Sequence, residues 1–447
     1  MNLTTRLAPA VLALTVSAPF AVAPAQATPA PSPESNAARF WPVVPGAVHQ
    51  VKVRLGDLTT AGTVTSGHTD PADWAGLEAP GTTRPSGVPG IQIDGYFPDT
   101  STFNTDHGWN HDSQFVIRLP DHWNGGLVVA GPPGVRKQYA SDRIIGDRAL
   151  AQGYAYASTD KGNSGDTLYL DGKRPGDAIM EWNQRMTQLT RAAKTVVAQR
   201  YMRRPQHTYV AGLSAAGYLV RWQLENNPGM YDGGIDWNGL LFTPKNSLLS
   251  TLPPALRAYP RLKAGQASAR NELLAAGYPA TSEPTWGWHY ANQWDFFQRV
   301  VREELDPSYD GDRLGGTPFC AEGTGAGCDT DYDLSKRPQS VQNAVRRVSL
   351  TGKLKRPLIT LHGTNDALVP ITRTSDVYDD MARPRLHRYY RIVGGAHVDG
   401  LAGAFPGVIA PMLPCFDAGF DALVRWTHGV RPPVSATVTP GKGTCAL

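Results

Sequence analysis

The stretch Thr208-Tyr209-Val210-Ala211-Gly212-Leu213-Ser214-Ala215-Ala216-Gly217 decides the fold of this chain. Its β-branched and aromatic first half predicts a short buried strand, and residues 218–224 after it predict a helix. A strand, a tight turn with a serine and a helix make up a nucleophile elbow, in which small residues permit the strained turn. The G-x-S-x-G pattern is incomplete, because Ala216 holds the last glycine position and Gly217 follows it. We expect alanine to fit there, so Ser214 is the candidate nucleophile.

Strands and helices are predicted to alternate along the rest of the chain. Strands are expected at 51–55, 90–93, 115–120, 126–130, 154–158, 357–361 and 387–393, and helices at 141–152, 177–201, 374–381 and 418–426. Such alternation is typical of parallel βαβ units. The predicted fold class is therefore α/β, an α/β-hydrolase fold with a mostly parallel central sheet.

The alternation stops between residues 243 and 348, where helical pieces, tryptophans and a Gly-rich segment follow one another. We interpret this block as a cap over the carboxyl edge of the sheet, where open α/β sheets bind ligands. The predicted organisation is a signal peptide (1–27), a lead-in with an irregular β segment (28–105), the first part of the core (106–242), the cap (243–348) and the second part of the core (349–447).

The N-terminus has the features of a secretory signal. A positively charged start and an apolar run precede Ala25-Gln26-Ala27, a small-x-small cleavage site, so we expect cleavage after Ala27 and a secreted protein. No second apolar stretch of about 20 residues follows, so no membrane anchor is predicted. The net charge of +4 is small for 447 residues and basic residues do not cluster, which argues against a nucleic-acid partner.

The four cysteines predict two disulfide bonds, because the expected export places the chain in an oxidising compartment. Three pairings are possible. We favour Cys320–Cys328, which closes a Gly-rich loop, and Cys415–Cys445, which ties down the C-terminal tail.

We expect no metal and no cofactor. A zinc site has no C-x-x-C or nearby histidine pair to support it. Asp329, Asp331 and Asp333 alternate as in calcium loops, but the following glycine and the distal acid are missing.

Two further residues complete a catalytic set with Ser214. Asp366 follows the strand at 357–361, and His397 follows the strand at 387–393, each in a loop that contains glycine. The order Ser, Asp, His is the one found on α/β-hydrolase sheets. His397 would take the serine proton and Asp366 would orient and stabilise the imidazole. His362, early on the acid loop, and Asp376, inside a predicted helix, are weaker alternatives.

An oxyanion hole needs two aimed backbone N–H groups. Ala215, directly after the nucleophile, should supply one. The other should come from residues 131–135, and because Pro132 and Pro133 have no N–H, Gly134 or Val135 is the expected donor.

Two pairs of residues are candidate substrate contacts. Asp160 and Lys161 lie at the end of a central strand, where they would touch substrate or cap a loop. Trp286 and Trp288 of the cap would suit an aromatic or sugar group, or form ordinary cap core. Both alternatives stay open for each pair.

These segments resemble an exported α/β-hydrolase family, the tannase and feruloyl esterase group. The similar pieces are Leu119-Pro120, Trp123-Asn124-Gly125-Gly126 with the glycine loop after it, residues 153–162, the serine elbow, Gly363-Thr364-Asn365-Asp366 and Gly394-Gly395-Ala396-His397. Members of that group commonly carry disulfide-bonded cysteines beside the serine and the histidine, where this chain has Leu213 and Val398. Thr159-Asp160-Lys161-Gly162 is also similar to secreted hydrolases of 3-hydroxybutyrate oligomers.

The resemblance implies a serine esterase that hydrolyses carboxylic esters beneath a cap. We expect a small-molecule or oligomeric ester as substrate, with an aromatic acid as one possibility. The alternatives are a secreted serine peptidase with the same triad, a hydrolase of hydroxyalkanoate oligomers and a non-enzymatic binding protein on this fold. Acyl and alcohol specificity and oligomeric state stay open.

Overall fold

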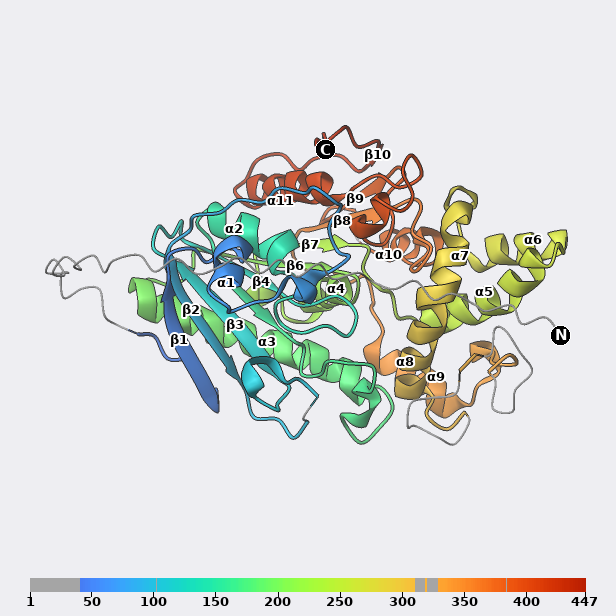
Figure 1. Ribbon diagram of the computed structural model, residues 1–447, viewed down its shortest axis with the longest axis horizontal. Helices are drawn as coiled ribbons and strands as arrows, with labels where there is room; N and C mark the ends of the chain where they lie inside the picture. The colour runs from blue at the N-terminus through green and yellow to red at the C-terminus, as the bar shows by residue number, and fades with distance from the viewer. Residues whose placement is uncertain (1–40, 102, 310–317, 320–328, 383) are drawn as a thin grey trace, which may run out of the picture. The chain divides into compact units, whose positions relative to one another are not determined.

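A mixed β-sheet carries the fold (Figure 1). The computed structural model describes residues 41–101, 103–309, 318–319, 329–382 and 384–447, so the predicted signal peptide and the predicted Cys320–Cys328 bond lie outside the described residues. Within them, ten strands form one sheet in the order β1-β2-β3-β5-β4-β6-β7-β8-β9-β10. The strands are β1 His49–Leu55, β2 Gly90–Tyr96, β3 Gln114–Pro120, β4 Gly126–Ala130, β5 Ala155–Thr159, β6 His207–Leu213, β7 Gly233–Trp237, β8 Leu358–Gly363, β9 His387–Ile392 and β10 Ala436–Val438.

Most of the sheet is parallel. β1, β2, β3 and β5 pair antiparallel in succession, whereas each pairing from β5 through β4 to β10 is parallel. This confirms the predicted mostly parallel α/β sheet. The carboxyl ends of β6, β8 and β9 lie at the same edge, and the loops that follow them carry Ser214, Asp366 and His397.

Helices cover both faces of the sheet. On one face pack the helices α3 Asp177–Tyr201 and α4 Ala215–Asn226, and on the other pack α2 Asp147–Ala151 and α11 Leu413–Thr427 (Figure 1). Because side chains alternate along a strand, the two faces build separate cores. Val129 and Val210 belong to the core with α3 and α4, and their neighbours Val128 and Tyr209 belong to the core with α2 and α11.

Further helices lie within residues 243–348, the segment predicted as a cap. They are α5 Leu248–Lys263, α6 Ala267–Ala276, α7 Trp286–His289, α8 Asp295–Leu305 and α9 Gln339–Val348. Figure 1 shows them beside one another at one end of the sheet. α7 and α8 are joined by a π-helical turn, Tyr290–Trp294. The remaining two helices of the described residues are α1 Thr60–Thr65 and α10 Ser375–Met381.

Two strands were not predicted. β7 reads Gly-Gly-Ile-Asp-Trp, a composition that is poor for a strand, yet it lies in the middle of the sheet. A Cβ on Gly234 would lie only 2.8 Å from Val220 and 3.0 Å from Leu224, so α4 packs tightly over this glycine. The short β10 is extended because it pairs with β9, and its own three residues do not predict a strand.

The C-terminal tail is held by a disulfide bond. Cys415 in α11 is bonded to Cys445, as predicted, at a sequence separation of 30. β10 lies between the two cysteines in the sequence, so the bond closes the segment that extends the sheet beyond β9.

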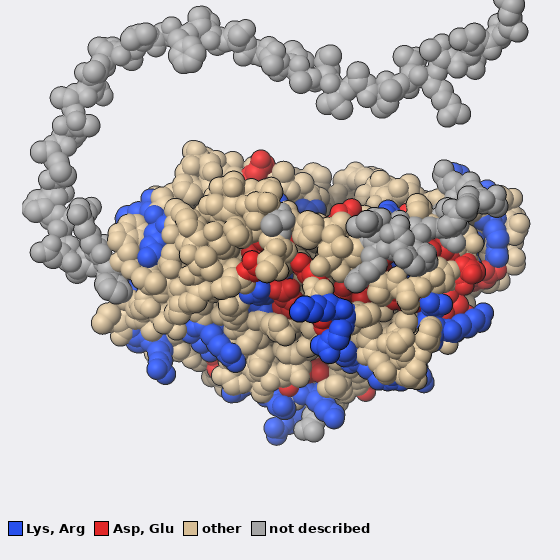
Figure 2. Space-filling model, turned by 90° about the horizontal axis from the view of Figure 1, so that it is seen from below, with Lys and Arg blue, Asp and Glu red and all other residues tan. Residues whose placement is uncertain are grey.

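Charges of both signs are interspersed on the surface. On the face shown in Figure 2, acidic side chains gather near the middle and Lys and Arg side chains lie around them. None of the helices in the described residues is both long enough and apolar enough to cross a membrane.

Candidate active site

Ser214 stands in a strained turn between β6 and α4. Its backbone has φ 61° and ψ −118°, which places a non-glycine residue in the left-handed half of φ space. Such strain persists where the surrounding structure enforces it, and it is common at active sites. The Ser214 N–H donates to the carbonyl of Trp237 at 2.9 Å, which fixes the turn against the end of β7. The hydroxyl side chain is only 6% exposed.

Two glycines make the elbow possible. A Cβ on Gly212 would lie 2.4 Å from the backbone of Ala216, so the first turn of α4 crosses directly over β6. A Cβ on Gly217 would lie 2.4 Å from Asp236 Oδ1 and 2.6 Å from the Cα of Gly239. The close contact between α4 and the end of β7 therefore falls at Gly217, and Ala216 is accommodated as expected.

The structure brings Ser214, His397 and Asp366 together. His397 Nε2 lies 2.9 Å from Ser214 Oγ, and His397 Nδ1 lies 2.8 Å from Asp366 Oδ2. Asp366 is fully buried and His397 is 4% exposed. With an ionised Asp366, the Nδ1–H donates to the carboxylate and Nε2 is free to accept the serine proton.

Asp366 is held ionised by its surroundings. Burial alone would raise the pKa of its carboxyl, but His397 and His362 outweigh burial and hold the pKa well below its usual range. Oδ1 also accepts from the N–H groups of Leu368 and Val369 at 2.9 and 2.8 Å. The carboxylate is therefore fixed in both charge and direction.

The acid and histidine loops approach each other through glycines. A Cβ on Gly363 would lie 2.2 Å from the carbonyl oxygen of Gly395, so only glycine allows this approach. Asn238, at the end of β7, bridges the same loops. Its Nδ2 donates to the carbonyls of Ala396 and His397 at 2.7 and 3.0 Å, and its Oδ1 accepts from the N–H of Gly363 at 2.8 Å.

The weaker alternatives for the triad have other partners, although His362 Nε2 also lies 3.4 Å from Asp366 Oδ2. Both ring nitrogens of His362 are engaged, Nδ1 with Ser375 Oγ at 2.7 Å and Nε2 with the Val369 carbonyl at 2.9 Å. Asp376 in α10 accepts from Tyr389 and Arg391. Neither residue contacts Ser214 in the structure.

The predicted oxyanion donors lie beside the serine. Ala215, Gly134 and Val135 all line the cavity next to Ser214. Gly134 has φ +53°, a conformation that favours glycine. Among the described residues, the structure gives no acceptor for the N–H of Ala215 or of Gly134. Both N–H groups are therefore available to an oxygen placed in the cavity.

A small apolar cavity adjoins Ser214. It has about 30 Å³ of free space. It is lined by Gly134, Val135, Leu168, Ile179, Trp182, Ser214, Ala215, Leu240, Leu248, Phe297, Val300, Val301, Glu304, Leu368 and Val369. Helix α8 of the cap, the N-terminal turns of α3 and the elbow thus enclose one space.

The predicted substrate contacts do not line this cavity. Asp160 is fully buried and accepts from the N–H groups of Gln114 and Gly162, so it closes a loop, which was the other alternative. Lys161 is also fully buried. Trp286 is fully buried in the cap and donates to Ser282 Oγ, while Trp288 packs on the cluster that includes Ala396.

The aromatic residues that do line the cavity are Trp182 and Phe297, and neither is among the residues predicted to contact substrate. Asn238 follows a strand that its own sequence does not predict. Of these residues, only Trp182 could have been recognised from the sequence. It lies near the N-terminal end of a predicted helix, and this end is expected at the sheet edge that carries Ser214, Asp366 and His397.

The three aspartates considered for calcium have separate protein partners. Asp329 pairs with Arg302, Asp331 accepts from Tyr309, and Asp333 accepts from the N–H of Ser335. Within the part of the chain that the structure describes, no group of three or more His, Cys, Asp or Glu side chains is arranged to hold a metal ion.

Comparison with known proteins agrees with this geometry. The sequence profile of the family described as "Tannase and feruloyl esterase" matches residues 101–237. Feruloyl esterase B from Aspergillus oryzae is 13% identical, with a TM-score of 0.57 over 86% of this chain and 88% of that one. An esterase from Aspergillus oryzae is 14% identical, with a TM-score of 0.53 over 88% of each chain. Among curated protein sequences none matches.

The fold and the site define an α/β-hydrolase, as predicted. The similarity to the tannase and feruloyl esterase family covers residues 101–237, and it marks the chain as a carboxylic ester hydrolase. The resemblance recognised from the sequence is thereby confirmed. The matched segment spans β3 to β7 and contains the serine elbow, but it ends before the acid and the histidine.

Proposed function

We propose that the protein hydrolyses carboxylic esters through Ser214, His397 and Asp366 by way of an acyl-enzyme. The observation that carries this proposal is the unbroken chain of contacts from Ser214 Oγ to His397 at 2.9 Å and from His397 to Asp366 at 2.8 Å. A serine is a weak nucleophile until an adjacent base takes its proton, and this arrangement supplies the base and its orienting acid.

In the acylation step Ser214 Oγ attacks the ester carbonyl carbon while its proton passes to His397 Nε2. The carbonyl oxygen becomes an oxyanion, which the N–H groups of Ala215 and of Gly134 or Val135 stabilise. The bond between the carbonyl carbon and the alcohol oxygen then breaks, and His397 gives its proton to the leaving alcohol. Asp366 stays ionised and stabilises the imidazolium between the two transfers.

In the deacylation step water takes the place of the alcohol. Water attacks the acyl carbon as His397 Nε2 accepts one of its protons. The bond to Ser214 Oγ breaks, the serine recovers the proton and a carboxylic acid leaves. The net reaction adds one water to the ester, so no co-reactant is needed.

The cavity supports an apolar acyl group. Its lining is dominated by Leu, Ile, Val and aromatic side chains, and an acyl chain attached to Ser214 would lie against them. We further propose that the protein is exported, on the basis of the N-terminal signal pattern, and that it acts on small or oligomeric esters outside the cell.

The test is hydrolysis by the mature protein and by Ser214→Ala, which should fold alike because only one buried hydroxyl changes. We expect wild type to hydrolyse p-nitrophenyl acetate or butyrate, and Ser214→Ala to lose on the order of 10⁴-fold in kcat. Equal inactivity of both proteins on every ester would refute the esterase. If only an aminoacyl anilide were cleaved, the peptidase alternative would replace it.

A further inference from the structure

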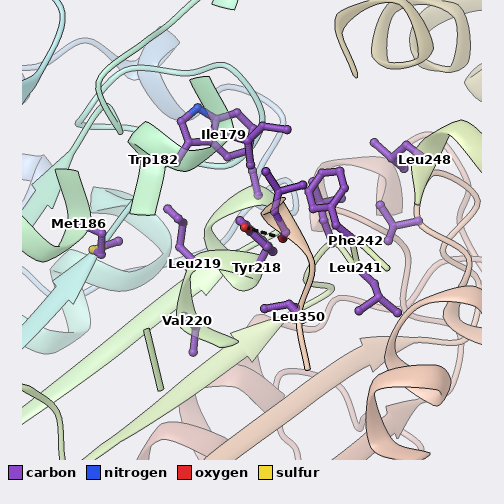
Figure 3. Packing of buried hydrophobic residues seen from close by; sticks show 14 of the residues in the cluster. Ile179, Trp182, Met186, Tyr218, Leu219, Val220, Leu241, Phe242, Leu248 and Leu350 are labelled. Atoms are coloured by element: carbon purple, nitrogen blue, oxygen red, sulfur yellow. Dashed lines mark hydrogen bonds between the residues drawn. The ribbon is translucent and has the colours of Figure 1, made fainter. Parts of the chain in front are cut away.

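Trp182 is fixed at the wall of the cavity by two contacts. Its Nε1–H donates to Asn163 Oδ1 at 2.6 Å, and the Nζ of Lys161 lies 5.1 Å from the centre of its ring. The side chain is 4% exposed and lies one turn after Ile179 in α3, a neighbour that also lines the cavity. Figure 3 shows both residues side by side above Leu219 and Tyr218 of α4. The indole is therefore a rigid surface.

Lys161 contacts the indole but is not among the residues that line the cavity. It is fully buried. Its backbone is held at φ 73°, and its Nζ has Asp160 O at 3.5 Å. Burial lowers the pKa of this ammonium to about 7, although Asp160 and Asp112 act in the opposite direction. A cation over an aromatic face is attracted to the ring, and more strongly when water is excluded.

The rest of the cavity offers little to a polar acyl group. Apart from Ser214, Glu304 is the one lining residue with a polar side chain, and its Oε1 already accepts from the N–H groups of Ala178 and Ile179 at 2.9 and 3.4 Å. Free space of about 30 Å³ corresponds to roughly two water molecules. A phenolic acid with several hydroxyls would have to enlarge this space and bury those hydroxyls beside apolar side chains, which is costly.

We propose that Trp182 is the specificity-determining wall of the acyl site, that Lys161 is its positioning residue, and that the enzyme thereby prefers short, apolar acyl groups. This inference rests on the proposed function. It adds a substrate class and assigns Lys161 a role behind the wall, where the sequence suggested contact with substrate.

The test compares acyl groups on one alcohol. For wild type we expect kcat/KM for p-nitrophenyl acetate and butyrate to exceed that for the octanoate by at least about tenfold. Methyl gallate should be poorer than methyl butyrate by a similar factor. In Trp182→Ala the octanoate-to-acetate ratio should rise at least about tenfold, because the space left by the indole admits the longer chain. Trp182→Phe, which keeps an aromatic wall, should shift the ratio in the same direction by less.

Lys161→Met tests the positioning role, because methionine fills similar space without the charge. We expect the octanoate-to-acetate ratio to rise about threefold or more, through KM, with kcat on acetate within about twofold. Trp222→Ala in α4, a tryptophan outside the cavity lining, is the matched control and should leave the ratio unchanged.

The failure of this inference is distinguishable from failure of the esterase itself. If wild type hydrolyses acetate but takes octanoate or gallate as well, the short apolar preference is wrong while the esterase stands. An unchanged ratio in both Trp182 variants would remove Trp182 as the wall. A Lys161→Met enzyme with wild-type ratios would remove Lys161 from the mechanism of selection.

Discussion

At the scale of single residues, we infer that Asn238 positions the loop that carries His397. It holds the carbonyls of Ala396 and His397 and the N–H of Gly363 with one side chain, from a backbone with φ 48°. We predict that Asn238→Gly lowers kcat by on the order of 10- to 100-fold with KM nearly unchanged, because the histidine loop loses its register with the acid loop. Glycine accepts the left-handed backbone, so the loss isolates the side chain.

The measurement for Asn238→Gly is steady-state kinetics on p-nitrophenyl butyrate beside a thermal unfolding curve. A kcat within about twofold of wild type would contradict a positioning role. A rise in KM with unchanged kcat would assign Asn238 to substrate binding instead.

The charge on Asp366 should be visible in the pH dependence of stability. Because its pKa is lower when folded than when unfolded, the native state binds fewer protons than the unfolded state below about pH 4. The stabilisation is therefore fully present above about pH 4 and is lost as the pH falls towards the folded pKa. Asp366→Asn has no such titration. We predict that the stability advantage of wild type over Asp366→Asn is larger at pH 6 than at pH 3 by about 1 kcal/mol.

Urea unfolding of both proteins from pH 3 to pH 6 measures this difference. A gap between the two proteins that stays constant over that range would mean that the Asp366 carboxyl has an ordinary pKa in the folded state.

At the scale of elements, the elbow depends on where α4 touches β7. We predict that Gly217→Ala destabilises the protein by about 3 kcal/mol, because its Cβ would meet the side chain of Asp236 and the backbone of Gly239. Asp236 cannot move freely, since it pairs with Arg221 at 2.6 Å and accepts from Thr360 at 3.0 Å.

Ala216→Gly is the matched control one residue away. It restores the full G-x-S-x-G pattern, yet we expect a loss of only about 1 kcal/mol, from the lower helix propensity of glycine. Chemical unfolding of both variants measures the two losses of stability. A Gly217→Ala protein as stable as Ala216→Gly would show that the close packing in the elbow is not located at Gly217.

The elements themselves were largely predictable where local pattern and tertiary role agree. Helix α3 has the bounds predicted for it, 177–201, and its apolar residues are the ones buried against the sheet. β7 was not predicted, because its local sequence pattern and its tertiary role disagree. Its glycines and its buried Asp236 are there for the packing of α4 and the pairing of Arg221, and both requirements come from residues distant in sequence.

The same limit applies to the candidate site. Chain order and strand ends were enough to predict that Ser214, Asp366 and His397 lie together. The burial of Asp160 and Lys161 was not predictable, because they follow the end of a strand but turn inward, and only the loops packed around them decide this. The role of Trp182 depends on the cap helix α8, which lies more than one hundred residues later in the chain.

At the scale of the whole molecule, the candidate site is assembled from residues before, within and after the segment 243–348 that is predicted as a cap. Leu213 and Val398 stand where relatives were expected to carry a disulfide; Leu213 belongs to a buried hydrophobic cluster and Val398 packs against the same cluster. The single disulfide in the described residues lies instead at the C-terminal tail. The active site thus keeps its shape through buried apolar contacts, Asn238 and the glycine approaches.

If Ser214 is the nucleophile, it carries the acyl group during turnover. Acid quenching during turnover of p-nitrophenyl butyrate, followed by mass spectrometry of the peptide that contains Ser214, measures this most directly. We predict one butyryl group on Ser214 in wild type and none in Ser214→Ala. Steady hydrolysis with the acyl group on another residue, or undiminished hydrolysis by Ser214→Ala, would contradict it.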